Sequence, residues 1–241
     1  MIPSRLGSTR LPEKALLHET GKFLFQHVWE RVRQARRVGR VIVATDHARI
    51  IAAAQSFGAE AVLTSPSHPS GTDRVAEVAR TLADERPDAL IVNVQGDEPE
   101  IDPADLDLLV DAIDRDRECA VATLATPFTS EAELAGASAV KVVVDAVGRA
   151  LYFSRSVVPN GARAGAEPPQ ALKHRGVYAF RRAKLLELAA LPPAPLEQIE
   201  RLEQLRWLHH GERIRVAITP RDGIGIDTPE DYRRFVRGGV R

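Results

Sequence analysis

An apolar run that turns abruptly polar, at residues 89–100, constrains the fold more than any other stretch. Residues 89–94 read ALIVNV and predict a short strand that is buried on both faces. The chain continues with Gln95, Gly96 and Asp97, and Pro99 ends the strand. Open α/β sheets bind ligands outside the carboxyl ends of their strands. The run therefore predicts an α/β sheet with a polar site at this strand end.

Asp97 is the candidate ligand for a hard cation at that site. Mg²⁺ takes carboxylate and phosphate oxygens, and Gly96 allows a sharp turn or the close approach of a ligand. A single aspartate after a strand is usually better explained as the cap of the next helix. Here Asp102 and Pro103 supply a better helix start, which weakens that explanation.

Strands and helices alternate along the first half of the chain. Apolar runs predict further strands at residues 40–45 and 61–63, and helical spacing recurs at residues 22–37, 48–57 and 75–82. This order predicts a doubly wound, largely parallel α/β sheet.

The second half of the chain adds a β-hairpin. Residues 140–144 and 149–153 flank a turn at residues 145–148 and predict two paired strands. Other predicted elements are helices at residues 105–115 and 196–209 and strands at residues 120–125, 173–180 and 214–218. We expect one domain over residues 1–241, in which about residues 139–180 form the hairpin part.

Composition argues against some classes of partner. Lys+Arg and Asp+Glu number 33 each, so the net charge of zero favours neither nucleic acid nor a membrane surface. No apolar stretch is long enough to span a bilayer, and the N-terminus lacks the apolar core of a secretion signal, so we expect a cytoplasmic location. The single cysteine, Cys119, is expected to pack as a small core residue.

A basic loop at residues 3–14 (PSRLGSTRLPEK) is the second candidate site segment. It is rich in Gly, Ser and Pro and carries the cations Arg5, Arg10 and Lys14. Backbone N–H groups and clustered cations suit a polyphosphate. The loop lacks the Gly-Lys-Ser/Thr ending of a Walker A loop.

Asp227 is the second candidate carboxylate. It stands before Thr228 and Pro229 and, taken alone, is better explained as a helix cap. Its other interpretation is a second acidic strand end, which would make it a partner for Asp97.

Seven stretches together resemble the 3-deoxy-manno-octulosonate (Kdo) cytidylyltransferase family of lipopolysaccharide biosynthesis. They are residues 3–14 (PSRLGSTRLPEK), 44–47 (ATDH), 70–74 (SGTDR), 93–99 (NVQGDEP), 151–155 (LYFSR), 195–206 (PLEQIERLEQLR) and 227–231 (DTPED). The resemblance covers essentially the whole chain, and the order and spacing of the motifs make it specific. It implies a nucleotidyltransferase fold of the GT-A-like type, a homodimer paired through the hairpin region, and Mg²⁺-dependent synthesis of CMP-Kdo and pyrophosphate from CTP and Kdo.

The resemblance also implies roles for individual residues. Arg5, Arg10 and Lys14 would bind the CTP phosphates, with Ser8 and Thr9 beside them, and Asp97 and Asp227 would hold Mg²⁺. The cytidine contacts would be Ser70, Gly71 and Arg74, and the Kdo contacts Gln95, Arg155, His174, Tyr178, Glu203 and Gln204. From the residues alone, His174 and Tyr178 fit a half-buried strand, and Glu203 and Gln204 fit a solvated helix face.

Two departures from the family pattern bear on activity. The family has a full apolar strand before the basic loop, where this sequence has Met1 and Ile2, so we expect a misassigned start or a truncated strand. Glu13 replaces the usual glycine, and its carboxylate either repels the triphosphate or points to solvent.

Two other functions compete with the leading one. A cytidylyltransferase for another acidic sugar, such as an 8-amino analogue of Kdo or a sialic acid, would differ in a few contacts. A catalytically weak nucleotide-sugar binding protein would explain the two departures, but the pair Asp97 and Asp227 argues against it.

Overall fold

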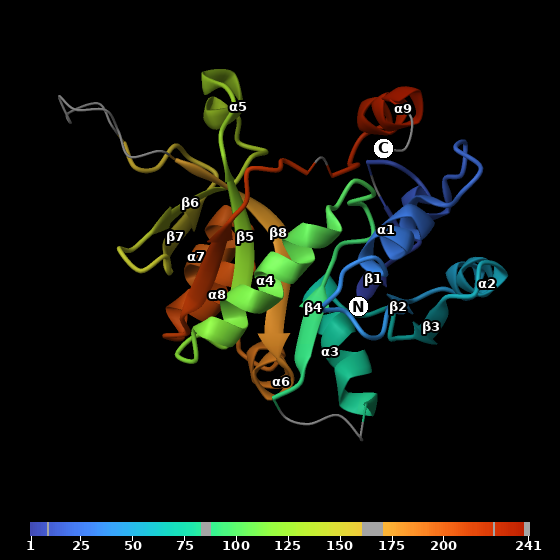
Figure 1. Cartoon of the computed structure of the whole chain (residues 1–241), viewed down its shortest axis with the longest axis horizontal. Helices are drawn as coiled ribbons and strands as arrows, with labels where there is room; N and C mark the ends of the chain where they lie inside the picture. Colours follow the sequence, from blue (N-terminus) through green and yellow to red (C-terminus); the bar gives the residue numbers. More distant parts are fainter. Residues whose placement is uncertain (9, 83–87, 161–170, 224, 239–241) are drawn as a thin grey trace. The chain divides into compact units, whose positions relative to one another are not determined.

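The chain folds into two compact units. The computed structural model describes residues 1–8, 10–82, 88–160, 171–223 and 225–238. Unit 1 comprises Met1–Asp107 and Gly223–Arg241, and unit 2 comprises Leu108–Asp222. Helix α4 (Pro103–Arg115) carries the chain from the first unit into the second (Figure 1), and it matches the helix predicted at residues 105–115.

Unit 1 is built on a parallel sheet. Strands β1 (Ile2–Ser4), β2 (Ile42–Thr45) and β3 (Glu60–Leu63) pair in that order, both pairs parallel. Strand β4 (Leu90–Asn93) lies on the other side of β1, because the Met1 amine donates to the Val92 carbonyl at 2.6 Å and Val94 N–H to the Met1 carbonyl at 3.0 Å. The predicted parallel α/β sheet is confirmed, and Met1 and Ile2 belong to its buried part.

The helices of unit 1 follow the predicted apolar spacing. Those at the predicted stretches are α1 (Leu24–Val32), α2 (Ala48–Ser56) and α3 (Gly71–Thr81), and unit 1 also contains α9 (Pro229–Gly238) and the short 3₁₀ helix η1 (Lys14–Leu16). Helix α3 begins before residue 75 because Ser70 caps it, its hydroxyl accepting the Asp73 N–H at 3.1 Å. In α9, Tyr232 and Phe235 pack with Leu11 of the basic loop, which fixes the middle of that loop to the core.

Unit 2 contains a mixed sheet. Its strands are β5 (Val121–Pro127), β6 (Lys141–Val144), β7 (Ala150–Ser154), β8 (Leu172–Arg181) and β9 (Ile214–Ile218), in the order β7-β6-β8-β5-β9. Strands β5 and β9 are parallel, and the other neighbouring pairs are antiparallel. Strands β6 and β7 form the predicted hairpin, whose turn is closed by Gly148 N–H and the Asp145 carbonyl at 3.0 Å.

The helices of unit 2 correct one prediction. The helix predicted at residues 196–209 is wrong, since the chain forms α7 (Pro195–Glu200) and α8 (Gln204–His209) with Arg201 between them at φ 53°. The N–H of Leu202 donates back to the Glu197 carbonyl at 3.2 Å, which ends α7. Helices α5 (Glu131–Ala135) and α6 (Arg182–Ala189) were not predicted.

The side chain of Cys119 lies in the core of unit 2. It has no exposed surface, which confirms the predicted packing role. Burial raises the pKa of its thiol to about 11, with a further contribution from the neighbouring Asp116 carboxylate, 3.4 Å from the sulfur.

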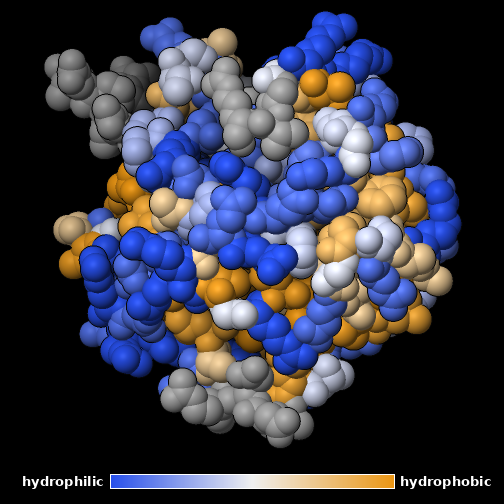
Figure 2. Space-filling view, turned by 45° about the vertical axis from the view of Figure 1, so that its right-hand side comes forward, coloured by the Kyte–Doolittle hydropathy of each residue, from blue (hydrophilic) through white to orange (hydrophobic). Residues whose placement is uncertain are grey.

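The face drawn in Figure 2 is mostly hydrophilic, with smaller hydrophobic patches. Among the described residues, large hydrophobic side chains with substantial exposure are Leu63, Val147, Leu151, Val157, Leu196, Ile199 and Ile218. Within the described ranges we find no helix with the length and apolar character needed to cross a membrane.

Candidate active site

The candidate site of unit 1 lies where the strand order of its sheet reverses. From β1 the chain builds outward through β2 and β3, and it then returns to form β4 on the opposite side of β1. Such a reversal opens a crevice outside the carboxyl ends of the two central strands. The basic loop leaves the end of β1, and Gln95, Gly96 and Asp97 follow the end of β4.

A pocket of about 300 Å³ occupies this position. Predicted site residues that line it are Arg5, Ser8, Arg10, Lys14, Ser70, Gly71, Arg74, Gln95, Asp97 and Asp227. Thr9 lies outside the described residues. The structure thus brings together ten of the predicted residues, and the four Arg and Lys side chains outnumber the two carboxylates, which suits a polyanionic ligand.

Two glycines allow the pocket walls to approach each other. A Cβ on Gly96 would lie 2.4 Å from the Ser4 hydroxyl oxygen and 3.0 Å from the Pro3 carbonyl oxygen. A Cβ on Gly71 would lie 3.2 Å from both the Gln95 amide oxygen and the Pro3 ring. The end of β1 is therefore closely packed between the loop after β4 and the start of α3.

Asp97 and Asp227 share one cation. The Lys14 ammonium lies 2.5 Å from Asp97 Oδ2 and 3.2 Å from Asp227 Oδ1, and Arg10 Nη2 is 3.0 Å from the same Asp227 oxygen. A backbone bond from Ile226 N–H to the Asp97 carbonyl, 2.8 Å long, holds the two acidic segments side by side. Residues 130 positions apart thus form one acidic pair around an ammonium group.

Neither carboxylate of the pair serves as a helix cap. Asp102 Oδ1 accepts the N–H of Ala104 at 2.8 Å, so Asp102 performs that role for α4. At α9 the Thr228 hydroxyl accepts the Asp231 N–H at 3.1 Å, and the Asp231 carboxylate accepts the Thr228 N–H at 3.0 Å. The oxygens of Asp97 and Asp227 are therefore left to face cations.

A buried ion pair that the sequence did not predict supports the start of the basic loop. Arg74 is 3% exposed, and its guanidinium donates to Asp46 Oδ2 at 3.1 Å, to the Thr64 hydroxyl at 2.5 Å and to the Ser65 carbonyl at 3.3 Å. The other Asp46 oxygen accepts the N–H of Leu6 at 3.2 Å. Arg74 thus lines the pocket while it anchors the loop through Asp46. The sequence feature that could have pointed to Asp46 was its position directly after strand β2, within the motif at residues 44–47.

In unit 2 the predicted residues Tyr178 and Gln204 are buried and His174 is half-buried. His174 Nε2 lies 3.0 Å from the Thr123 hydroxyl, and its ring centre is 5.5 Å from that of Tyr178. Tyr178 also packs edge-on against Trp207 of α8, with ring centres 5.2 Å apart. Burial, and secondarily the charge of Glu203, raises the pKa of the Tyr178 hydroxyl. The Nε2 of Gln204 is buried and has no hydrogen-bond partner among the described residues.

Arg155 has extensive contacts to the backbone of unit 2. Its Nε donates to the Glu200 carbonyl at 2.9 Å, Nη1 to the Ala137 carbonyl at 3.1 Å and Nη2 to the Arg201 carbonyl at 3.5 Å. Its own N–H donates to the Glu200 carboxylate at 2.9 Å. Arg155 directly follows β7, and these bonds hold its guanidinium against the end of α7 and the residue that follows it.

The burial of His174 gives a testable pH dependence. Burial lowers the pKa of its imidazole to about 3, whereas the pKa of an unfolded histidine is about 6.5. Between these values the unfolded state binds the proton first, so the free energy of unfolding falls as the pH falls. From pH 8 to pH 5 we expect His174 to contribute a loss of about 2 kcal/mol.

Urea unfolding at several pH values between 8 and 5 measures this loss. We expect His174→Gln protein to show a flatter pH dependence than the wild type, even if it is less stable throughout. His210→Gln is the control, because His210 is exposed. An unchanged slope in His174→Gln protein would contradict the assignment.

Relatives of this chain are found by sequence. The model of the cytidylyltransferase family matches residues 1–214. A protein of Syntrophobacter fumaroxidans named 3-deoxy-manno-octulosonate cytidylyltransferase is 48% identical over 236 residues, covering 98% of this chain and 94% of that protein. A protein of the same name from Anaeromyxobacter sp. (strain Fw109-5) is 53% identical over 234 residues, covering 97% and 93% of the two chains.

Solved structures agree with these sequence matches. CMP:2-keto-3-deoxy-manno-octonic acid synthetase in complex with CTP has a TM-score of 0.91 and 44% identity to this chain, covering 98% of this chain and 95% of that one. The 4-diphosphocytidyl-2C-methyl-D-erythritol synthase of Anaerococcus prevotii has a TM-score of 0.64 at 13% identity, with 100% and 98% covered, and shares the fold alone.

Proposed function

The chain belongs to the cytidylyltransferase family, and from that premise we propose that it transfers CMP from CTP to the anomeric hydroxyl of Kdo. The products are CMP-Kdo and pyrophosphate, in a step of lipopolysaccharide biosynthesis. The observation that carries the proposal is the pocket of unit 1, which four cationic side chains line and in which Lys14 and Arg10 contact a pair of carboxylates, at the carboxyl ends of β1 and β4. Because CTP is a cytoplasmic nucleotide, we place the enzyme in the cytoplasm.

The acidic pair fits a divalent metal ion. Asp97 and Asp227 already converge on one cation, the Lys14 ammonium, and hard cations such as Mg²⁺ take the same carboxylate oxygens. Among the described residues no cluster of three or more His, Cys, Asp or Glu side chains could hold a metal, so phosphate oxygens and water would complete its coordination. When bound, Mg²⁺ would polarise the α-phosphate of CTP.

The residues of the basic loop supply positive charge to the phosphates. Arg5, Arg10 and Lys14 would bind the triphosphate and stabilise the charge that develops on the leaving pyrophosphate. Ser8 lies beside them in the pocket wall. The anomeric hydroxyl of the sugar would attack the α-phosphorus, and such transfer depends mainly on positioning and electrostatics.

Separate groups of residues would contact the base and the sugar. Ser70 and Gly71, at the start of α3, would contact the cytidine, and Arg74 would support them through Asp46. For the acidic sugar we propose the residues of unit 2 that the resemblance implies, Arg155, His174, Tyr178, Glu203 and Gln204. Gln95 lines the pocket of unit 1. The buried, unpartnered Nε2 of Gln204 and the guanidinium of Arg155, held in place by backbone carbonyls, support this choice, since a carboxylate sugar needs positioned donors.

Pyrophosphate release tests the proposed function directly. We expect release from wild-type protein with CTP, Mg²⁺ and Kdo together, and none when Kdo or Mg²⁺ is omitted. ATP and GTP should not replace CTP. If the protein used a sialic acid in preference to Kdo, its sugar substrate would be a sialic acid. If it released no pyrophosphate with any acidic sugar, the chain would be a nucleotide-binding protein without this activity.

We further propose a homodimer. Support comes from exposed apolar side chains of unit 2, where Leu151 of β7 is 63% exposed and Ile199 of α7 is 78% exposed. Light scattering at assay concentration should give about twice the mass of one chain. A monomer mass would contradict the proposal.

A further inference from the structure

Glu13, the residue that departs from the family pattern, is held in a strained backbone conformation. Its φ is 50° and its ψ is 30°, in the left-handed region that favours glycine. Among the described residues other than glycine, only Arg201 shares a positive φ. The left-handed conformation is unfavourable for a residue other than glycine, so other contacts must hold Glu13 there.

The Glu13 side chain makes a two-pronged contact with helix α2. Both Nη atoms of Arg49 donate to the Glu13 carboxylate, Nη1 to Oε1 and Nη2 to Oε2, the second at 2.8 Å. This planar pairing matches the forked guanidinium to the carboxylate. Its hydrogen bonds lower the pKa of Glu13, and the carboxylate points to a cation on α2. Of the two expectations for Glu13, the structure supports the one that points it to solvent: its side chain is 49% exposed and does not line the pocket, while it also pairs with Arg49.

The position of Glu13 couples the pair to the pocket. Lys14, the next residue, reaches both Asp97 and Asp227, and Arg10 lies three residues earlier. Asp46 anchors the beginning of the basic loop through Leu6 N–H, and Leu11 packs in the core. The Glu13–Arg49 pair ties the end of the same loop to the body of unit 1.

We infer that Glu13 and Arg49 are positioning residues, which hold the basic loop so that Arg10 and Lys14 meet the triphosphate. The inference rests on the proposed use of CTP. It predicts the direction of the change in Kd for CTP: removing the Glu13 charge should weaken CTP binding. If the carboxylate repelled the triphosphate, the same change would strengthen it.

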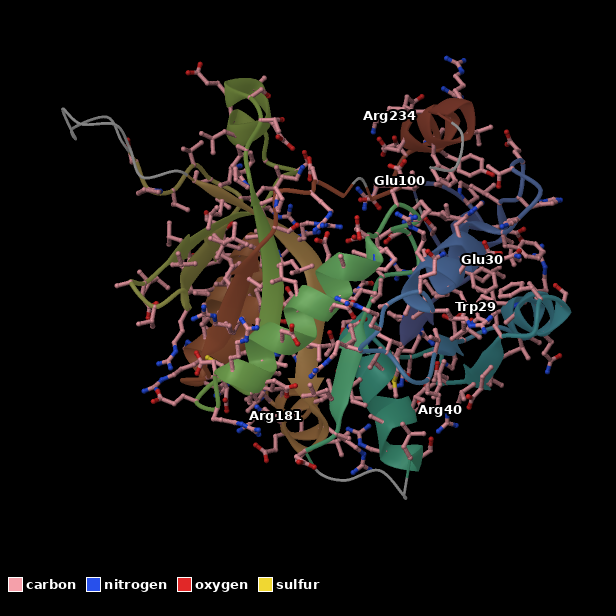
Figure 3. All side chains as sticks on the ribbon, viewed as in Figure 1. Trp29, Glu30, Arg40, Glu100, Arg181 and Arg234 are labelled. Carbon is pink, nitrogen blue, oxygen red and sulfur yellow. The ribbon has the colours of Figure 1, made fainter. Side chains whose placement is uncertain are left out.

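A second ion pair of unit 1 serves as a matched control. Arg40 Nε and Nη2 donate to the two Glu60 oxygens at 2.9 and 2.7 Å (Arg40 is labelled in Figure 3). Arg40 and Glu60 are 52% and 42% exposed, against 54% and 49% for Arg49 and Glu13. Neither residue of the control pair lines the pocket. The two pairs therefore share chemistry and exposure and differ in their link to the basic loop.

Calorimetric titration of CTP in the presence of Mg²⁺, together with steady-state kinetics, tests the inference. We compare the wild type with Glu13→Gln, Arg49→Gln and their double variant, and with Glu60→Gln and Arg40→Gln as controls. We expect each variant of the Glu13–Arg49 pair to raise Kd and KM for CTP by about 3- to 10-fold, with kcat within about twofold. The double variant should resemble the single ones because they remove the same contact.

The remaining outcomes separate the inference from the proposed function. The control variants Glu60→Gln and Arg40→Gln should have a Kd for CTP within about twofold of the wild-type value. Exposed ion pairs contribute little to stability, so the melting temperatures of all the variants should stay close to that of the wild type. An equal effect of Glu13→Gln and Glu60→Gln, or tighter CTP binding by Glu13→Gln, would overturn the inference while leaving the function intact. Wild-type protein that neither binds nor turns over CTP would overturn both.

Discussion

Asp97→Asn protein is expected to lose at least about 100-fold in the rate of pyrophosphate release, while its melting temperature changes by only a few degrees. Asparagine keeps the size and one acceptor oxygen of the side chain but removes its negative charge. Asp97 is partly exposed, with its side chain at 30%, so little packing is lost. What is lost is half of the acidic pair that converges on a single cation, 2.5 and 3.2 Å from Lys14.

Asp102→Asn is the control for this experiment. Asp102 lies five residues further along the same loop, caps α4 and does not line the pocket. Asparagine also caps helices well, so we expect activity and stability close to the wild type. Binding of Mn²⁺ in the presence of CTP, followed by electron paramagnetic resonance, provides a readout besides activity. Asp97→Asn protein with wild-type turnover would exclude Asp97 as a metal ligand.

Arg74→Met is expected to have the largest effect on stability. The change removes the partner of Asp46, whose side chain is only 16% exposed, and leaves the Thr64 hydroxyl and the Ser65 carbonyl without their donor. Breaking a buried pair from one side costs about 3–5 kcal/mol. For a chain of this size that corresponds to a melting temperature lower by on the order of 10 °C.

Denaturant unfolding separates the effect of the lost charge from that of the lost packing. It compares the wild type with Arg74→Met, with the double variant Arg74→Met/Asp46→Asn and with Arg40→Met. Adding Asp46→Asn to Arg74→Met removes the unpaired buried carboxylate and should recover part of the loss. Arg40→Met breaks an exposed pair and should cost less than about 1 kcal/mol. We expect weaker CTP binding in Arg74→Met, since Asp46 also holds Leu6 N–H. An Arg74→Met protein as stable as Arg40→Met would disprove the anchoring role.

The central site elements were predictable because their signals are local. The apolar run before Asp97 and the charged loop that contains Lys14 each carry their pattern within about a dozen residues, and both end at the pocket. The sequence signal for Asp227 was weak when taken alone. The expectation that Asp227 would lie close to Asp97 is confirmed, because both contact the Lys14 ammonium. The parallel sheet of unit 1 followed from alternating strands and helices.

The wrong or missing predictions have physical reasons. The leucine spacing at residues 196–209 gave no sign of the break, because the break depends on one left-handed residue, Arg201. Before the break Ile199 is exposed, whereas after it Leu202 and Leu205 are buried. The Asp46–Arg74 pair joins residues 28 positions apart, and no local pattern reports such a contact. Likewise, Glu13 looked like an obstacle to the triphosphate because its partner, Arg49, lies 36 residues away.

The burial of Cys119 makes this chain convenient for site-specific labelling. With a thiol pKa of about 11, only about 1 in 10,000 molecules carries the thiolate at pH 7, and the thiolate is the form that reacts with maleimides. A cysteine introduced at an exposed position would react far faster, with no need to replace the native one. Leu63 of β3, which is 61% exposed and is not part of the apolar surface proposed for pairing, is such a position. One batch of the variant would carry a donor dye at this cysteine and another batch an acceptor dye. After the batches are mixed, energy transfer between the dyes would report the association of two copies.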